Sequence, residues 1–203
     1  SNIKKDLQIL KKSKKVDFVY LPKFRDIYND NKRPKIILNK KDKILCAKFR
    51  KGHFEGVLDV MNRLTKIINP NKIFMGEKDF QQLYLVKNFL EKRYKTKIVP
   101  CKTVRDKNKV ALSSRNFLLS SSNYVTASKI CKKLIDIKKE INNQKNIATF
   151  LKYHKKQLEK KFQIKIDYLE IRNIKNLKIS KKIKDTRLFI AYYLSNIRLI
   201  DNL

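Results

Sequence analysis

Apolar positions in the first half of the chain recur at two different periods. Segments with helical spacing, in which apolar side chains three and four positions apart share one face, predict three helices: residues 3–13, 57–68 and 79–94. Short apolar runs that end at a proline or a glycine predict three strands: residues 16–21, 72–75 and 96–99. Residues 36–45 follow neither period. Strand and helix alternate up to residue 99, which indicates an α/β layer with a parallel sheet.

The pattern changes after Asn116. Two longer helices are predicted over residues 120–142 and 147–162, and the serines from Ser120 offer a cap for the first of them. Alternating or continuous apolar positions predict strands at 164–168, 188–194 and 197–200. A helix pair with a small antiparallel sheet is an α+β unit, so we expect a domain boundary near residues 100–104. The predicted domains are 1–103 and 104–203, and His154, among lysines on the second helix, is expected at the surface.

Composition sets the class of protein. The chain has 203 residues, of which 42% are hydrophobic, enough to bury a core. The longest continuous apolar run, Leu188–Leu194, is far too short to span a bilayer, and no signal peptide is recognised. The three cysteines are widely spaced with no CxxC pair, which argues against a zinc site or a disulfide framework and favours a reducing cytosol.

The net charge of +33 has two interpretations. Lys and Arg number 51 against 18 acidic residues, which favours nucleic-acid binding. A drift in base composition predicts the same profile, because Lys, Ile and Asn have A/T-rich codons whereas Gly, of which there are three, has G-rich ones. The lysines are spread along the whole chain and no nucleic-acid-binding motif is present, so we expect only weak, salt-sensitive binding to polyanions.

Three segments contain most of the residues that could take part in catalysis or ligand binding: 50–57, 74–82 and 104–116. All three glycines lie in the first two, which predicts backbone with positive φ or a close approach to a ligand. The second segment joins a strand to a helix, at the edge of a sheet where α/β proteins bind ligands and where backbone N–H groups favour anions. The sequence lacks the GxxxxGK[ST] loop of P-loop ATPases.

Single residues in these segments have competing interpretations. Lys78 reaches a phosphate or is simply solvated, Asp79 caps a helix or binds a ribose hydroxyl, and Gln82 offers an amide to a second substrate. In the third segment Ser113, Ser114 and Arg115 form either a phosphate clamp or an exposed serine-rich loop. His53 is a phosphate contact, a structural hydrogen-bond partner or a base.

Four motifs in order resemble the pantothenate synthetase (pantoate–β-alanine ligase) family. They are RxGHFxGV at 50–57, GEKDFQQ at 76–82, RDxxxxALSSRN at 105–116 and RLIDN at 198–202. The resemblance covers essentially the whole chain. It implies a Rossmann-like nucleotidyltransferase domain, here N-terminally incomplete, followed by a small α+β C-terminal domain that carries the ALSSRN loop, and a homodimer.

The resemblance also implies the residues of the site. ATP would be bound by Gly76, Glu77, Lys78, Asp79, Val104, Leu112, Ser113, Ser114 and Arg115, with Val104 contacting adenine through its backbone. Of these, Lys78, Ser113, Ser114 and Arg115 would stabilise the charge that develops on the phosphates. Gln82 and Arg50 would bind pantoate and β-alanine.

The implied reaction joins pantoate to β-alanine in the cytoplasm. With ATP and Mg²⁺, the pantoate carboxylate forms pantoyl adenylate and pyrophosphate, and the β-alanine amine then displaces AMP. No specific nucleic acid, membrane or protein-bound metal is implied. Two alternatives remain: a basic nucleic-acid-binding protein on the same fold, and an adenylate-forming ligase for another acid.

The sequence departs from the family pattern in several places. It contains no HxGH motif and not the first of the family's substrate-binding glutamines, so we expect an unpaired sheet edge and an inactive chain when it acts alone. Cys46 and Ala47 replace a usual Glu-Gly, and Lys51 replaces a proline. Lys109-Val110 replaces Gly-Leu, which is expected to stiffen or reshape the closing loop.

Overall fold

The computed structural model describes residues 3–28, 36–180 and 182–203. The chain divides into two compact units, Ser1–Lys35 and Ile36–Leu203. The described part of the first unit holds helices α1 (Ile3–Ser13) and α2 (Phe24–Ile27), and neither helix has a buried residue. Among the described residues, no helix has both the length and the apolar character needed to cross a membrane.

The strand predicted at residues 16–21 is wrong. This run is irregular in the first unit, and its apolar side chains are exposed, Phe18 at 94%. A strand needs a hydrogen-bonding partner, and both sheets in the described part of the chain are built from other residues. The apolar run was therefore not sufficient to form a strand.

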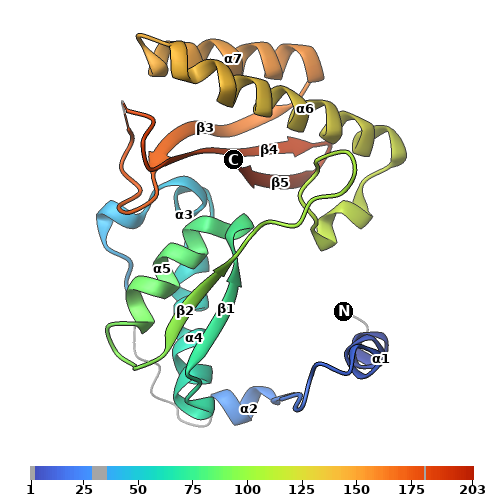
Figure 1. Ribbon diagram of the computed structural model, residues 1–203, viewed down its shortest axis with the longest axis vertical. Coiled ribbons are helices and arrows are strands. Elements are labelled where there is room, and N and C mark those ends of the chain that lie inside the picture. Colours follow the sequence, from blue (N-terminus) through green and yellow to red (C-terminus); the bar gives the residue numbers. More distant parts are fainter. Residues whose placement is uncertain (1–2, 29–35, 181) are drawn as a thin grey trace. The chain divides into compact units, whose positions relative to one another are not determined.

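The first part of the second unit is an α/β layer (Figure 1). Its elements in chain order are α3 (Leu45–Phe49), α4 (His53–Ile68), β1 (Lys72–Gly76), α5 (Phe80–Leu90) and β2 (Lys97–Cys101). The two strands are parallel, with Ile73 opposite Ile98, and α5 connects them. Pro100 lies inside β2, whereas the sequence predicted that it would end the strand. β2 pairs on one side only, and a proline is tolerated on an edge strand.

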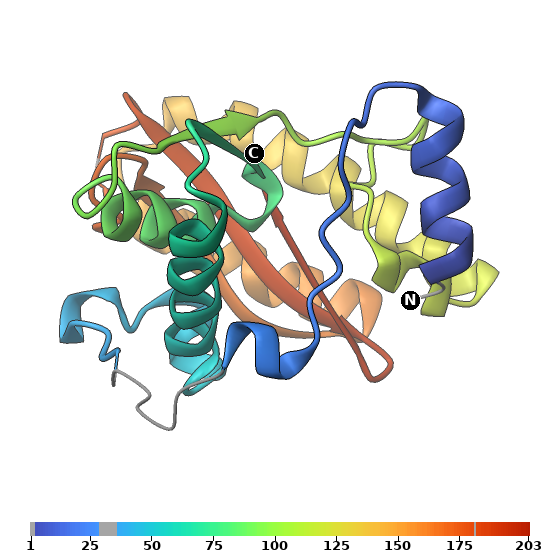
Figure 2. The ribbon, with the colours of Figure 1, turned by 90° about the horizontal axis from the view of Figure 1, so that it is seen from below.

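The second part carries two long helices and an antiparallel sheet. The elements are α6 (Ser121–Glu140), α7 (Ile147–Phe162), β3 (Lys165–Asn173), β4 (Thr186–Leu194) and β5 (Ile197–Asn202). The strand order is β3-β4-β5. Figure 2 shows these strands, orange to red, crossing in front of the two helices. The Ser120 hydroxyl accepts from the Asn123 N–H, which confirms the predicted cap of α6.

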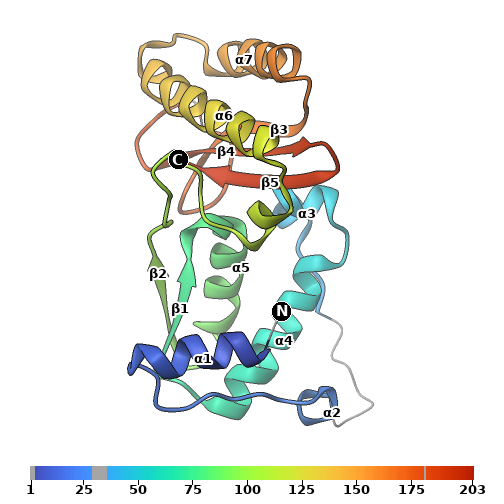
Figure 3. The same ribbon diagram turned by 90° about the vertical axis from the view of Figure 1, so that its right-hand side faces the viewer.

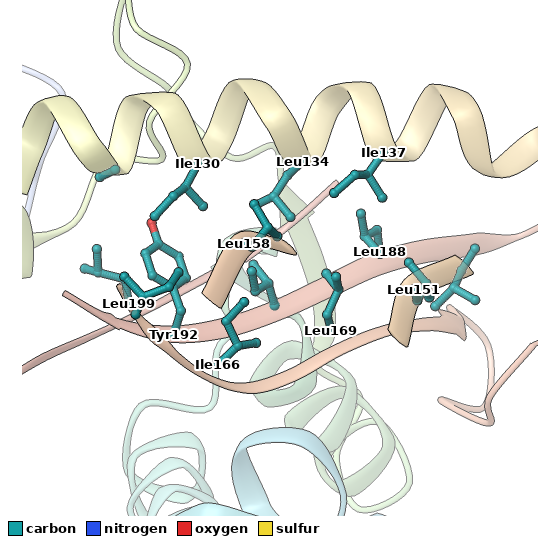
Figure 4. Close-up of a cluster of buried hydrophobic side chains, with 14 of the residues drawn as sticks. Ile130, Leu134, Ile137, Leu151, Leu158, Ile166, Leu169, Leu188, Tyr192 and Leu199 are labelled. Carbon is teal, nitrogen blue, oxygen red and sulfur yellow. The ribbon is translucent and has the colours of Figure 1, made fainter. Parts of the chain in front are cut away.

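One face of the antiparallel sheet packs against α6 and α7 (Figure 4). Every second residue of β4 lies on this face: Leu188, Ile190, Tyr192 and Leu194. This spacing is expected because successive side chains of a strand point to opposite faces of the sheet. Ile130, Leu134 and Ile137 of α6 meet them, and each is at most 1% exposed. This cluster is the hydrophobic core between the helices and the sheet.

The opposite face packs against the α/β layer (Figure 3). Phe189 and Ala191, the alternate residues of β4, share a core with Leu83 and Val86 of α5. The antiparallel sheet is thus a middle layer, with both faces covered. The mixed α/β architecture and the parallel pair are as predicted from the sequence, whereas the boundary near residues 100–104 stays a prediction.

His154 is buried, not at the surface as the sequence suggested. It is 8% exposed and its ring contacts Phe150 and Tyr153, with centroids 4.3 and 5.2 Å away. It lies one helical turn from both Leu151 and Leu158, the residues that α7 packs into the core. Its position in this 3–4 repeat, rather than the neighbouring lysines, determines its burial.

Candidate active site

The GEKD segment forms a tight turn at the carboxyl end of β1. Gly76 ends the strand, Glu77–Asp79 forms a single 3-10 turn, and α5 begins at Phe80. Asp79 occupies the cap position of α5 but makes no capping bond; its carboxylate lies 3.7 Å from the Lys78 ammonium. The Lys78 side chain is only 18% exposed, so it is not an ordinary solvated lysine.

Two residues far away in the sequence hold this turn. The side-chain amide of Asn202 donates to the carbonyls of Glu77 and Lys78, both at 2.9 Å. Arg187 pairs with the Glu77 carboxylate at 2.9 Å and lies over the Phe80 ring. The Glu77 side chain is therefore engaged with protein groups.

The ALSSRN loop is organised by an inner turn. The Asp106 carboxylate accepts from the N–H groups of Asn108 and Val110, and Lys109 adopts a left-handed backbone with φ 69°. Further along, the Ser113 hydroxyl accepts from the Arg115 N–H. The Arg115 guanidinium donates to the Arg198 carbonyl of β5 at 2.8 Å, which ties the loop to the antiparallel sheet.

The RxGHFxGV segment forms the turn after α3 and the first residues of α4. Gly52 has φ 77°, a left-handed conformation that suits glycine, and α4 starts at the next residue, His53. The other two glycines have ordinary φ values, and an added Cβ there would meet no protein atom within 4 Å. The prediction of positive φ therefore holds for Gly52 alone.

Two small cavities bring the three segments together. Each has a volume of about 30 Å³. The first is lined by Ser113, Arg115 and Asn116 of the loop, the second by Arg50, His53, Asp79 and Gln82. Lys78 and Asp201 line both. Because ligand sites are typically about 300–1,000 Å³, neither cavity is large enough by itself to enclose a ligand of that size.

Five predicted site residues line neither cavity among the described residues: Gly76, Glu77, Val104, Leu112 and Ser114. Val104 and Leu112 are 66% and 52% exposed, beside the segment that carries Arg115. The structure thus brings Lys78, Ser113 and Arg115 together, as well as Lys78, Asp79, Gln82 and Arg50.

Burial and the neighbouring positive charges lower the pKa values of two residues of the site, Arg50 and His53. Burial, and then the positive charge of Arg115, lower the pKa of Arg50. Burial, followed by Arg50 and Arg115, also lowers the pKa of His53. His53 is therefore a neutral imidazole at neutral pH, able to donate or accept a proton. The surrounding guanidinium groups favour an anionic ligand.

Several residues of this region were missed by sequence reasoning. Cys46 is buried here, with its thiol 3.1 Å from the Tyr168 hydroxyl and 3.5 Å from the Arg198 guanidinium. Gln81 is also buried; it accepts from the Ala47 N–H and donates to the carbonyls of Asp42 and Ile44. The RLIDN motif was noticed in the sequence without a role, and Asp201 and Asn202 come from it.

The described residues contain no group of three or more His, Cys, Asp or Glu side chains arranged to hold a metal ion. Asp79, with a half-exposed carboxylate, is the acidic side chain closest to Lys78 in this site. Mg²⁺ commonly uses only one or two protein carboxylates together with substrate phosphates and water. The donor set therefore fits a metal that arrives with a nucleotide.

The whole chain, residues 1–203, matches the family model described as pantoate-beta-alanine ligase. The chain belongs to this family. Among curated relatives, pantothenate synthetase of Leptospira interrogans serogroup Icterohaemorrhagiae serovar copenhageni is 37% identical, over 100% of this chain and 72% of the relative. Pantothenate synthetase of Buchnera aphidicola subsp. Acyrthosiphon pisum is 38% identical, over 98% and 71%.

Solved structures of the pantoate-beta-alanine ligase family have the same fold. Pantothenate synthetase from Thermus thermophilus superimposes with a TM-score of 0.90 at 26% identity, covering 100% of this chain and 74% of that one. Pantoate-beta-alanine ligase from Francisella tularensis, solved with beta-gamma ATP and beta-alanine, gives 0.79 at 32% identity and covers 100% and 70%. The resemblance first seen in four motifs is confirmed for the family and the fold.

Proposed function

We propose that this chain catalyses the ATP-dependent ligation of pantoate to β-alanine through a pantoyl adenylate. The observation that carries the proposal is the place of Lys78, which lines two adjoining cavities. One contains Ser113 and Arg115, and the other contains Arg50 and Gln82. The carboxylate of the acid and the α-phosphate of ATP must meet between the acid-binding pocket and the phosphate-binding loop. Lys78 places a positive charge at that point. The family membership supports the same reaction.

In the first step the pantoate carboxylate oxygen attacks the α-phosphorus of ATP. A new P–O bond forms, the bond to the β-phosphate breaks, and pyrophosphate leaves. Lys78, Ser113, Ser114 and Arg115 stabilise the charge on the phosphates, while Arg50 and Gln82 hold pantoate. Two anions repel each other, so most of the rate comes from orientation and from preorganised positive charge.

ATP also needs contacts outside the two cavities. We assign these to Gly76 and Glu77 of the turn, to the exposed Val104 before the ALSSRN loop, and to the exposed Leu112 within it. Asp79 is the carboxylate suited to Mg²⁺ bound with the nucleotide. The ion would offset the phosphate charge during attack.

In the second step the neutral β-alanine amine attacks the carbonyl carbon of the adenylate. A C–N bond forms, the C–O bond to AMP breaks, and the amine loses a proton. His53 lines the acid-binding cavity, and its lowered pKa leaves it neutral and able to accept that proton. The products are pantothenate and AMP.

Two further features are proposed, an oligomeric state from the family resemblance and a location from the cysteines. We expect a homodimer, which light scattering of the purified chain would test. We also expect a cytoplasmic location, because Cys46, Cys101 and Cys131 are all free thiols.

The proposal is tested by pantoate-dependent ATP–pyrophosphate exchange in the presence of Mg²⁺. Because the sequence contains no HxGH motif, the assay is run on the chain and on a fusion to the N-terminal part of the Leptospira relative. Exchange should require pantoate. Lys78→Ala should reduce it by about two orders of magnitude, the size expected when one preorganised charge contact is lost.

Lys72→Ala is the matched control. Lys72 starts the same strand, β1, at the end away from the turn, and it is exposed. It should leave exchange unchanged. Equal losses in both variants would contradict the assignment of Lys78, and exchange supported equally by other hydroxy acids would indicate a different acid substrate. Salt-sensitive RNA binding, with no exchange even in the fusion, would favour the nucleic-acid-binding alternative.

A further inference from the structure

The last two residues of β5, Asp201 and Asn202, have no role in the proposed chemistry, yet the side chain of each contacts one of the two segments proposed to bind phosphates. The backbone carbonyl of Asn202 also accepts from Arg105, at 3.1 Å, and this bond does not depend on the Asn202 side chain. Both are well buried: the Asp201 side chain is 10% exposed and Asn202 is 4% exposed. Their contacts reach segments about a hundred residues away in sequence or more.

Asn202 contacts the GEKD turn. Its amide nitrogen donates to the carbonyls of Glu77 and Lys78, both at 2.9 Å, and its amide oxygen accepts from Arg187 at 2.8 Å. Arg187 in turn pairs with the Glu77 carboxylate. A side chain that binds the carbonyl of Lys78 fixes the backbone from which the lysine side chain extends.

Asp201 contacts the other segment. Its carboxylate accepts two parallel bonds from the Arg105 guanidinium, at 2.7 and 2.8 Å, a bidentate geometry that is both strong and directional. Arg105 also donates to the Lys109 carbonyl and forms a β-bridge with Ala111. Asp201 therefore holds the base of the loop that ends in Ser113 and Arg115.

The strand itself is a firm support. Asp201 and Asn202 pair with Ile190 and Phe189 of β4, and Leu203 exchanges two backbone hydrogen bonds with Leu188. Adjacent residues of a strand point to opposite sides, so one strand end can reach two separate segments.

We propose that Asp201 and Asn202 are positioning residues that independently hold the loop carrying Arg115 and the turn carrying Lys78, and so set the spacing of the two around the transferred phosphate. The inference rests on the proposed function for its catalytic meaning. Its structural content, that each side chain holds one segment, does not depend on the proposed function and is tested separately.

The structural test uses hydrogen–deuterium exchange on the full chain with two isosteric variants. Asn202→Asp replaces the amide donor by an oxygen and should raise the exchange rate of residues 76–80 about tenfold, while residues 105–116 are unchanged. Asp201→Asn weakens the fork to Arg105 and should give the reverse pattern. Glu170→Gln is the control, because it removes a comparable ion pair, with Arg172, from the same sheet and should change neither segment.

The kinetic test uses pyrophosphate exchange in whichever form of the protein is active. Each variant should lower kcat about tenfold, whereas Glu170→Gln should not. Because Asn202 acts mainly through the turn that carries Lys78, Asn202→Asp should cause a clearly smaller loss when Lys78 is already alanine, and only the contacts of Gly76 and Glu77 remain to be disturbed. Asp201→Asn should still cause its full loss in that background, since it acts through the other segment.

The inference is overturned if neither variant changes the exchange of its own segment, or if both variants loosen both segments equally. If an isosteric variant fails to fold, two other variants test the same contacts. Asn202→Ser removes the amide that binds the turn, and Arg105→Lys removes the guanidinium that binds Asp201. They should give the same crossed pattern. Absence of pyrophosphate exchange in both the chain and the fusion would contradict the proposed function, and the deuterium pattern would still decide the structural inference.

Discussion

Replacing Lys109 by glycine should stabilise this protein, although it removes a side chain. Lys109 closes the turn that starts at Asp106, where its N–H donates to the Asp106 carbonyl at 3.0 Å. Its φ of 69° lies in the left-handed region, which is unfavourable for a residue with a Cβ. The family resemblance places glycine at this position, so the substitution restores the residue that the backbone requires.

The size of the effect follows from two opposing terms. A left-handed conformation costs an ordinary residue about 1–2 kcal/mol, which glycine avoids. Glycine also loses more backbone entropy on folding, by about 0.5–1 kcal/mol. The net stabilisation by Lys109→Gly is thus about 0.5–1 kcal/mol.

Lys107→Gly is the matched control. Lys107 is an exposed lysine in the same turn and is not among the described residues with positive φ. It should lose about 0.5–1 kcal/mol through the entropy term alone. The free energies of unfolding of the two variants, measured in urea, should therefore differ by about 1–2 kcal/mol. Each variant loses one positive charge, so the charge change does not contribute to this difference. Equal destabilisation by the two glycines would refute the strain at Lys109.

Three further predictions concern the C-terminal layer. Ser120→Ala removes the cap of α6 and should lower the free energy of unfolding by about 1 kcal/mol. Leu134→Ala should lower it by about 2–5 kcal/mol, because Leu134 is 1% exposed in the core between α6 and the sheet. Burial, opposed by Glu140, lowers the pKa of His154 below its usual 6.5. The unfolded chain therefore takes up this proton first, and stability should fall as the pH drops below 6.5.

Chemical denaturation checks all three. Ser121→Ala, one residue inside the same helix, should have little effect, and an equal loss there would argue against the cap. A loss below about 1 kcal/mol for Leu134→Ala would mean that the core is not packed as described. For His154, a His154→Gln variant should show a shallower decline with acid than the unmodified chain, and identical slopes would exclude the histidine as the cause.

Local sequence patterns were enough for most of the elements. The helix predicted at 147–162 is α7 with the same ends, and the strands predicted at 72–75, 188–194 and 197–200 each lie within an observed strand. These segments have a clear period and clear start or stop residues, which are properties of neighbours in sequence. The segments around Lys78 and Arg115 could also be found, because glycine, charge and hydroxyl groups are concentrated there.

The same patterns failed where the outcome depends on a distant partner. The apolar run at 16–21 has no partner strand in the described chain. Cys46 meets Tyr168, and Asn202 meets the Lys78 carbonyl, across more than half of the chain.

The sequence by itself determined the periods of the helices and strands, the motifs that identify the family and the chemical types of the site residues. Only the tertiary structure decided which faces are covered, which side chains share a cavity, and that the end of β5 contacts both proposed phosphate-binding segments. The physical reason is that propensity, capping and periodicity act over a few residues. Burial, ion pairing and cavity shape depend on segments that meet only after the chain has folded.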